Sequence, residues 1–204
     1  MARTARITVL VSGATALALT LAGCASSAEP GTPRVTITAS APAATTHNAA
    51  DTEFAQMMIV HHEGAVEMAD LVVTRAATEQ VRTLGQRISA AQGPEIATME
   101  SWLAAWGEDL PDAAEHGAMD HAGMDMNGMD QGEAMAALDA LDGEAFDRLF
   151  LELMIDHHRG AVEMSTIQVA EGENTGAIEL ARDIIAAQQS EIAEMEELLA
   201  ESAL

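Results

Sequence analysis

Apolar residues recur every three or four positions in four stretches of the chain, which is the spacing of one face of an α-helix. The first stretch, from about residue 51 to 77, has an apolar face formed by Phe54, Met58, His61, Ala65, Met68 and Val72. The second, ending near residue 106, carries Leu84, Ile88, Ala91, Glu95, Met99 and Trp102. Two later stretches, about 144–170 and from 175 onward, repeat this spacing. Short connections within each pair predict an all-α, antiparallel four-helix bundle made of two helix hairpins.

The two predicted hairpins have similar sequences. The string His-His-Glu-Gly-Ala-Val-Glu-Met that begins at His61 returns at His157, 96 residues later, with arginine in place of its first glutamate. Without an insertion, 22 of the 50 residues from 54 to 103 are identical to their counterparts at 150–199. Such an internal repeat marks a structural unit. We therefore assign a first hairpin to 51–106, a Met/His-rich loop to 107–143, where 133–141 could form a short helix, and a second hairpin to 144–204.

The first 50 residues do not belong to the predicted bundle. Two arginines precede a largely apolar segment, 7–22, that is too short to span a bilayer comfortably. It ends in Leu-Ala-Gly-Cys at Cys24, which resembles the lipobox of bacterial lipoproteins. We expect a lipoprotein signal peptide at 1–23, lipidation at Cys24 and a flexible tether at 24–50, which places the domain outside the cytoplasmic membrane, anchored by lipid. An ordinary secretory signal with a chance cysteine is the alternative.

Composition limits the classes of partner. The 204 residues include 33 acidic and nine basic side chains, all nine of them arginine, and the formal net charge is −24. This charge argues against binding to nucleic acid or to anionic membrane surfaces, and it is compatible with attracting cations. An acidic surface also serves solubility alone. The single cysteine excludes an internal disulfide bond.

Six polar residues stand on faces that otherwise belong to the core, three in each hairpin: His61, His62 and Glu95, then His157, His158 and Glu191. A buried polar group without a partner costs roughly 1–3 kcal/mol, so these groups must be paired or coordinated. In one interpretation, His61 or His62 hydrogen-bonds Glu95 within its hairpin, and the second copy does the same. In the other, imidazoles and carboxylates from facing helices converge on a metal ion. Two adjacent histidines, duplicated, favour metal.

Methionines strengthen the case for a soft metal ion. Four of them flank the histidine pairs, at Met58, Met68, Met154 and Met164. Methionine often only fills a core, but a mixed imidazole and thioether set prefers Cu(I). The loop adds His116, Met119, His121, Met124, Met126 and Met129 among glycines and acidic residues. Methionine has no packing role in so polar a stretch, so we predict a copper trap there; the alternative is a low-complexity linker with chance methionines.

The repeated string, together with Ala-Gln-x-x-Glu-Ile-x-x-Met beginning at Ala91 and Ala187, resembles the secreted bacterial domain-of-unknown-function family 305. The resemblance covers both hairpins. It implies a ferritin-like four-helix domain whose paired histidines are His61-His62 and His157-His158. Some members, the CopM-type proteins, are implicated in periplasmic copper binding and resistance, so the resemblance also implies a role in copper handling.

These features predict a metal-binding lipoprotein that sequesters or hands on copper, with Cu(I) favoured, for copper tolerance. Binding is favoured over catalysis: no nucleophile, nucleotide-binding motif or Glu-x-x-His is present, and we predict no catalytic residue. Two alternatives stay open. One is a ferritin-like oxidase of iron or another metal that uses His61, Glu95, His157 and Glu191. The other is a structural or interaction domain whose histidines are satisfied by the two glutamates. The sequence identifies no partner protein.

Overall fold

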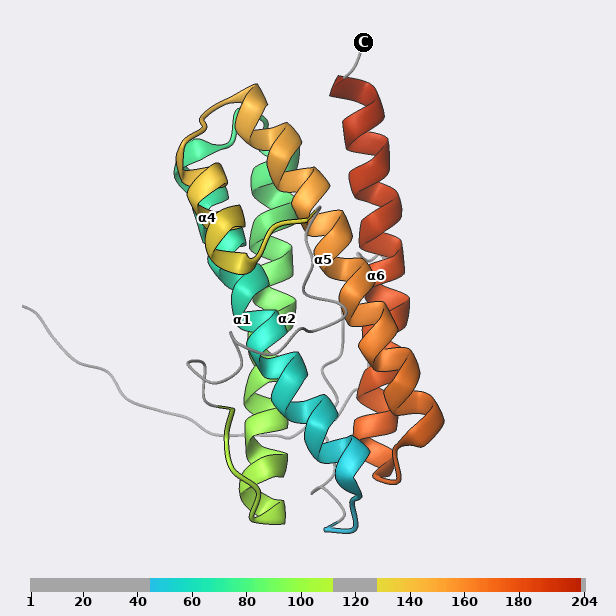
Figure 1. Ribbon diagram of the computed structural model, residues 1–204. Coiled ribbons are helices and arrows are strands. Elements are labelled where there is room, and N and C mark those ends of the chain that lie inside the picture. Colours follow the sequence, from blue (N-terminus) through green and yellow to red (C-terminus); the bar gives the residue numbers. More distant parts are fainter. Residues whose placement is uncertain (1–44, 112–127, 203–204) are drawn as a thin grey trace, which may run out of the picture. The chain divides into compact units, whose positions relative to one another are not determined.

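The computed structural model describes residues 45–111 and 128–202, and five helices form this part of the chain (Figure 1). Four are long: α1 (Ala49–Arg75), α2 (Glu79–Trp106), α5 (Glu144–Glu171) and α6 (Thr175–Ser202). The short α4 (Gln131–Asp139) precedes α5 and overlaps the short helix considered at 133–141. Helices α1 and α2 form one antiparallel hairpin, α5 and α6 form the other, and α1 packs against α5. The predicted all-α bundle of two helix hairpins is therefore confirmed.

Several sequence predictions fall outside the described residues. They concern the signal peptide at 1–23, the tether up to residue 44, and the loop residues 112–127, with Cys24, His116, Met119, His121, Met124 and Met126. Of the predicted loop ligands only Met129 is described, and it packs partly buried against the core. None of the helices in the described ranges combines the length and apolarity needed to cross a bilayer.

Local sequence fixes where the helices begin and end. The Asn48 side chain caps α1 in a capping box with Asp51, and Thr78 caps α2 by accepting a hydrogen bond from the backbone N–H of Val81. Helix α2 ends at Gly107, whose φ of 78° lies in the left-handed region that glycine adopts without strain. These caps satisfy backbone groups that the helix ends would otherwise leave without partners.

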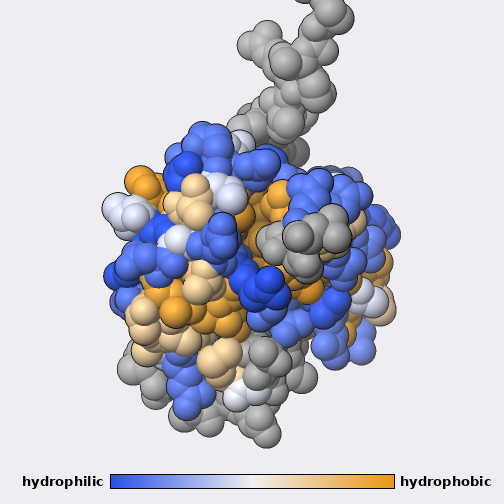
Figure 2. Space-filling model, turned by 90° about the horizontal axis from the view of Figure 1, so that it is seen from above, coloured by the Kyte–Doolittle hydropathy of each residue, from blue (hydrophilic) through white to orange (hydrophobic). Residues whose placement is uncertain are grey.

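The core consists of two clusters that lie on either side of the buried histidines. One cluster uses residues 54–59 of α1 and Ala161 of α5, and the other uses 65–72 of α1 and 146–155 of α5. Along both helices the histidine pair falls between the two clusters, because α1 and α5 run in opposite directions. We call His61, His62, His157 and His158 the histidine layer. At the end of the bundle viewed in Figure 2, hydrophilic residues dominate the rim and apolar residues show toward the middle.

Buried carboxylates tie each hairpin to the turn of the other. Asp51, at the start of α1, has no exposed surface. It accepts hydrogen bonds from the backbone N–H groups of Glu173 (3.1 Å) and Asn174 (3.0 Å) in the α5–α6 turn, and from Nε2 of Gln168 (2.6 Å). Burial raises the pKa of Asp51, but these hydrogen bonds and one from the Asn48 backbone outweigh it and lower the pKa. The carboxylate is therefore charged at neutral pH.

Asp147, at the start of α5, plays the same part for the α1–α2 turn. It accepts hydrogen bonds from the backbone N–H groups of Ala77 (2.9 Å) and Thr78 (3.0 Å), and from Oγ1 of Thr78 (2.8 Å). Asp51 and Asp147 are 96 residues apart, the same offset as in the repeat. This pair is not among the residues predicted from the sequence. The offset of 96 residues could have identified it. A single acidic residue in the first turn of a helix would not, because acids are common there.

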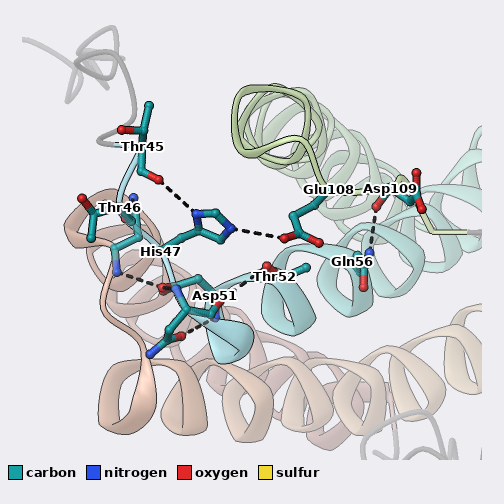
Figure 3. A network of polar contacts seen from close by, with 10 residues as sticks. Thr45, Thr46, His47, Asp51, Thr52, Gln56, Glu108 and Asp109 are labelled. Atoms are coloured by element: carbon teal, nitrogen blue, oxygen red, sulfur yellow. Dashed lines mark hydrogen bonds and ion pairs between the residues drawn. The ribbon is translucent and has the colours of Figure 1, made fainter.

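The residues before α1 are also tied to the end of α2 (Figure 3). The His47 ring stacks on Trp106, with centroids 4.6 Å apart and an angle of 6° between the planes. Its Nδ1 lies 3.0 Å from the Thr45 carbonyl oxygen and its Nε2 lies 3.4 Å from Oε1 of Glu108. The hydrogen bond to Thr45 and the carboxylate of Glu108 raise the pKa of His47. This contact fixes the point at which the described chain enters the bundle.

Candidate metal centre

One histidine–glutamate pair connects the two helices of each hairpin. Nε2 of His62 on α1 lies 2.7 Å from Oε2 of Glu95 on α2, and Nε2 of His158 on α5 lies 2.7 Å from Oε2 of Glu191 on α6. Both imidazoles are fully buried, whereas the glutamate side chains are 24% and 15% exposed. The carboxylates thus reach inward from the edge of the bundle. This is the arrangement of the first interpretation, with the second histidine of each pair as the partner.

The first histidine of each pair meets its counterpart across the α1–α5 interface. The ring centroids of His61 and His157 are 3.6 Å apart, and the planes are inclined by 45°. Burial, followed by the nearby rings of His61, His158 and His62, holds the pKa of His157 well below its ordinary value of 6.5. His157 is therefore neutral at pH 7, and a neutral imidazole is the form that can bind a metal ion.

Three buried ring nitrogens in the histidine layer have no hydrogen-bond partner in the structure: Nδ1 of His62, His157 and His158. The carboxylates of Glu95 and Glu191 face Nε2 of His62 and His158, so we assign the ring protons to Nε2. That tautomer leaves a lone pair on Nδ1 of His62 and of His158. A carboxylate that holds one ring nitrogen while the other is free for a metal is a common arrangement at metal sites. The layer therefore offers donors that fit a soft cation.

The structure adds two buried polar residues that the sequence analysis did not select. Gln92 and Gln188 are each 3% exposed, and their side-chain Oε1 atoms have no hydrogen-bond partner in the structure. Each lies three residues before the glutamate of its hairpin, so it shares a helix face with that glutamate. They are 96 residues apart, and this offset on an apolar face was the signal that could have identified them.

The methionines beside the histidines are core residues. Met58, Met68 and Met154 have no exposed surface, and Met164 is partly buried. Because α1 and α5 are antiparallel, Met58 lies in the same cluster as Met164, and Met68 lies in the same cluster as Met154. Each side of the histidine layer thus has thioethers from both hairpins.

The predicted ligands do not all converge. In residues 45–111 and 128–202, no group of three or more His, Cys, Asp or Glu side chains is arranged to hold a metal ion. Glu95 and Glu191 each contact the histidine of their own hairpin, while His61 and His157 meet at the centre. Any site in this layer thus relies on imidazole and thioether donors more than on carboxylates.

The fold and the histidine layer define a class of four-helix domains built from two similar hairpins. Residues 51–199 match the family described as Domain of unknown function (DUF305), and the chain belongs to this family. A DUF305 protein from Streptomyces coelicolor, described as secreted, is 35% identical, with a TM-score of 0.64 over 76% of this chain and 94% of that chain. A DUF305 fragment from Deinococcus radiodurans is 32% identical, with the same TM-score, over 76% and 97%. No curated protein matches the chain.

Another structural neighbour, CopM, has been solved with copper bound. CopM in the Cu(I)-bound form is 29% identical to this chain, with a TM-score of 0.62 over 74% of this chain and 96% of that chain. CopM has also been solved in Cu(II)-bound, Ag-bound and apo forms. The family resemblance predicted from the motifs is confirmed. Binding of copper and silver is a property of a structural neighbour of this protein.

Proposed function

We propose that this protein binds copper outside the cytoplasmic membrane, mainly as Cu(I), and sequesters it or hands it on to limit copper stress. The observation that carries the proposal is the set of buried Nδ1 atoms without partners at His62, His157 and His158. Imidazole and thioether donors suit Cu(I), and both are present in and beside the histidine layer. The similarity to CopM, solved with Cu(I) and Cu(II), supports the choice of metal.

Copper is the cargo in this proposal, and the histidine layer supplies its ligands. The four imidazoles coordinate it, with thioether donors from Met58, Met68, Met154 and Met164. Glu95 and Glu191 act on copper through the histidines: each accepts the Nε2–H of its partner and so keeps Nδ1 free. Removing either carboxylate would free the ring to adopt the other tautomer.

The proposal also includes the Met/His-rich loop and the lipid anchor. The loop, with His116, Met119, His121, Met124, Met126 and Met129, captures Cu(I) weakly and reversibly, and Cys24 holds the protein at the membrane through lipid. Where the described chain resumes after the loop, it docks beside the histidine layer. Gln131 donates a hydrogen bond of 3.1 Å from Nε2 to the carbonyl oxygen of Gly64. This contact brings the end of the loop close to His62.

A Cu(I) titration under reducing conditions, in competition with a chromophoric chelator, tests the proposal. We expect the purified protein to withdraw Cu(I) tightly, and the variant with alanine at all four histidines of the layer to lose the tight binding. A second variant with serine at Met119, Met124, Met126 and Met129 should lose only a weaker component. Tight binding that persists without the four histidines would contradict the proposed site and assign copper to the loop.

A structural role is the second candidate, and the histidine–glutamate hydrogen bonds favour it, because they satisfy part of each buried pair without metal. Under this alternative, Cu(I) neither binds tightly nor raises the melting temperature, whereas a bound ligand stabilises the folded state. Thermal unfolding with and without Cu(I) therefore separates the two candidates. Oxygen consumption with Fe(II) or Cu(I) would indicate the oxidase instead.

A further inference from the structure

The two histidine–glutamate pairs differ in what faces their carboxylates. In the second hairpin, Oε1 of Glu191 lies 3.8 Å from Nε of Arg87. Arg87 belongs to α2 and also pairs with Glu194 on α6, so it links the two hairpins. In the first hairpin, no arginine of the described ranges pairs with Glu95, whose one ion-pair partner there is His62. The two glutamates are thus equivalent toward the interior and different toward solvent.

The antiparallel course of α2 and α6 identifies the residue opposite Glu95 (Figure 1). Arg87 on α2 is opposite Glu191 on α6. Eight residues further along α2 is Glu95, and eight residues back along α6 is Asp183; this step is two helical turns plus about 80°, and it moves both positions by the same rise and rotation. Asp183 is also the counterpart of Arg87 at the offset of 96. The approximate twofold relation between the hairpins therefore assigns to Glu95 a carboxylate, Asp183, in the position that Arg87 has beside Glu191.

The residue next to each histidine pair shows the same difference in sign. Arg159 follows His158 and pairs with Glu196 on α6 at 3.1 Å. Its counterpart after His62 is Glu63, which is exposed. The second pair is therefore flanked by two arginines that bridge to α6, and the first pair is flanked by acidic residues at both equivalent positions.

We propose that soft monovalent cations reach the histidine layer between α2 and α6, past Glu95 and Asp183, and that Arg87 closes the equivalent route past Glu191. The inference rests on the proposed copper-binding function. The carboxylates attract a cation from solvent, and the guanidinium of Arg87 repels one. His62 is the first inward residue on this route, because its Nε2 contacts Glu95 at 2.7 Å, and its buried Nδ1, on the other side of the ring, has no hydrogen-bond partner.

The test measures how fast the purified protein withdraws Cu(I) from a chromophoric chelator, followed by loss of colour in a stopped-flow instrument. Asp183→Arg places an arginine on the open route, and Arg87→Asp removes one from the closed route. We expect the first change to slow the transfer roughly tenfold and the second to speed it roughly threefold. The double variant with Asp183→Arg and Arg87→Asp keeps the net charge and should transfer Cu(I) at a rate near that of the wild type. All variants should bind the same amount of Cu(I), because no proposed ligand is altered.

Glu201→Arg is the matched control, because it changes the charge by the same two units at the far end of α6, on an exposed residue. It should change the rate less than twofold at 0.15 M salt, where charges more than about 8 Å away are largely screened. Equal slowing by Glu201→Arg and Asp183→Arg would overturn the route, since only the overall field would matter. A loss of bound copper in Asp183→Arg would also overturn it, because Asp183 would then belong to the site. If the wild type binds no Cu(I), the proposed function fails, and the route with it.

Discussion

Helices α1 and α2 place nearly the same polar side chains inside the bundle as α5 and α6, but different ones outside it. Inside, both hairpins have a histidine–glutamate contact of 2.7 Å and a buried aspartate that holds the turn of the other hairpin. Outside, Arg87 corresponds to Asp183 and Arg159 corresponds to Glu63. The inner glutamates and aspartates have partners fixed by packing, whereas the outer charged groups are solvated and can change sign at little cost in stability.

The largest loss of stability should come from replacing Asp51 or Asp147, each of which binds the turn of the other hairpin. Asp51→Ala leaves three backbone N–H groups and the Gln168 amide without their acceptor, so we expect a loss of about 3 kcal/mol in the free energy of unfolding. Asp147→Ala should cost about 2 kcal/mol, because it frees two backbone donors and a hydroxyl that can turn elsewhere. Urea denaturation measures both. Losses below about 0.5 kcal/mol would show that the turns do not need these caps.

The next largest loss of stability should come from Gly85, where α2 approaches α1 closely. A Cβ added at Gly85 would lie 2.6 Å from Cγ2 of Val72, whereas the second hairpin has Ala181 and Gln168 at the equivalent positions. Gly85→Ala should therefore destabilise by about 2 kcal/mol, through overpacking that exceeds its gain in helix propensity. Val72→Ala in the same chain should recover part of this loss, so a double-mutant cycle should show favourable coupling. Additive effects would contradict the clash.

The buried, neutral His157 predicts a dependence of stability on pH. The folded protein disfavours the proton on His157, whose pKa lies well below 6.5, whereas the unfolded chain takes it up near 6.5. Stability should be fully present above pH 6.5 and fall below it, by at most about 1.4 kcal/mol per pH unit for this one proton. Urea midpoints at pH 7.5, 6.5 and 5.5 measure the slope. His157→Asn should flatten it; an unchanged slope in that variant would assign the proton elsewhere.

The outer differences should matter least for stability. Arg87 is 46% exposed and pairs with Glu191 and Glu194, and Arg159 is 58% exposed and pairs with Asp156 and Glu196. Each arginine-to-alanine change should cost less than about 1 kcal/mol, and less still in 0.5 M salt. Thermal unfolding at two salt concentrations checks this. A loss above about 2 kcal/mol would mean that the arginines hold the hairpins together and are not merely surface charges.

The sequence was sufficient for the helices, because their apolar spacing and their caps are local signals. It also showed that His61, His62 and Glu95 lie on buried faces, but it left open which histidine would meet the glutamate. That choice depends on how α1 crosses α5: the crossing brings His61 to His157 and leaves His62 to Glu95. Spacing along one helix contains no information about such a crossing. The same holds for Asp51 and Asp147, whose partners lie in a distant turn.

Each hairpin supplies the aspartate that binds the turn of the other, and this arrangement limits how the chain can assemble. A single hairpin would have an aspartate with no turn to bind and a turn with no aspartate to accept its backbone N–H groups. The first histidine of its pair would also lack the facing ring that His61 and His157 give each other. Only a second hairpin, related by an approximate twofold rotation, supplies both. A half-length chain would therefore have to dimerise in order to fold. In the full chain the connection between the hairpins makes that encounter intramolecular, so the bundle should unfold in one transition whose midpoint does not depend on protein concentration.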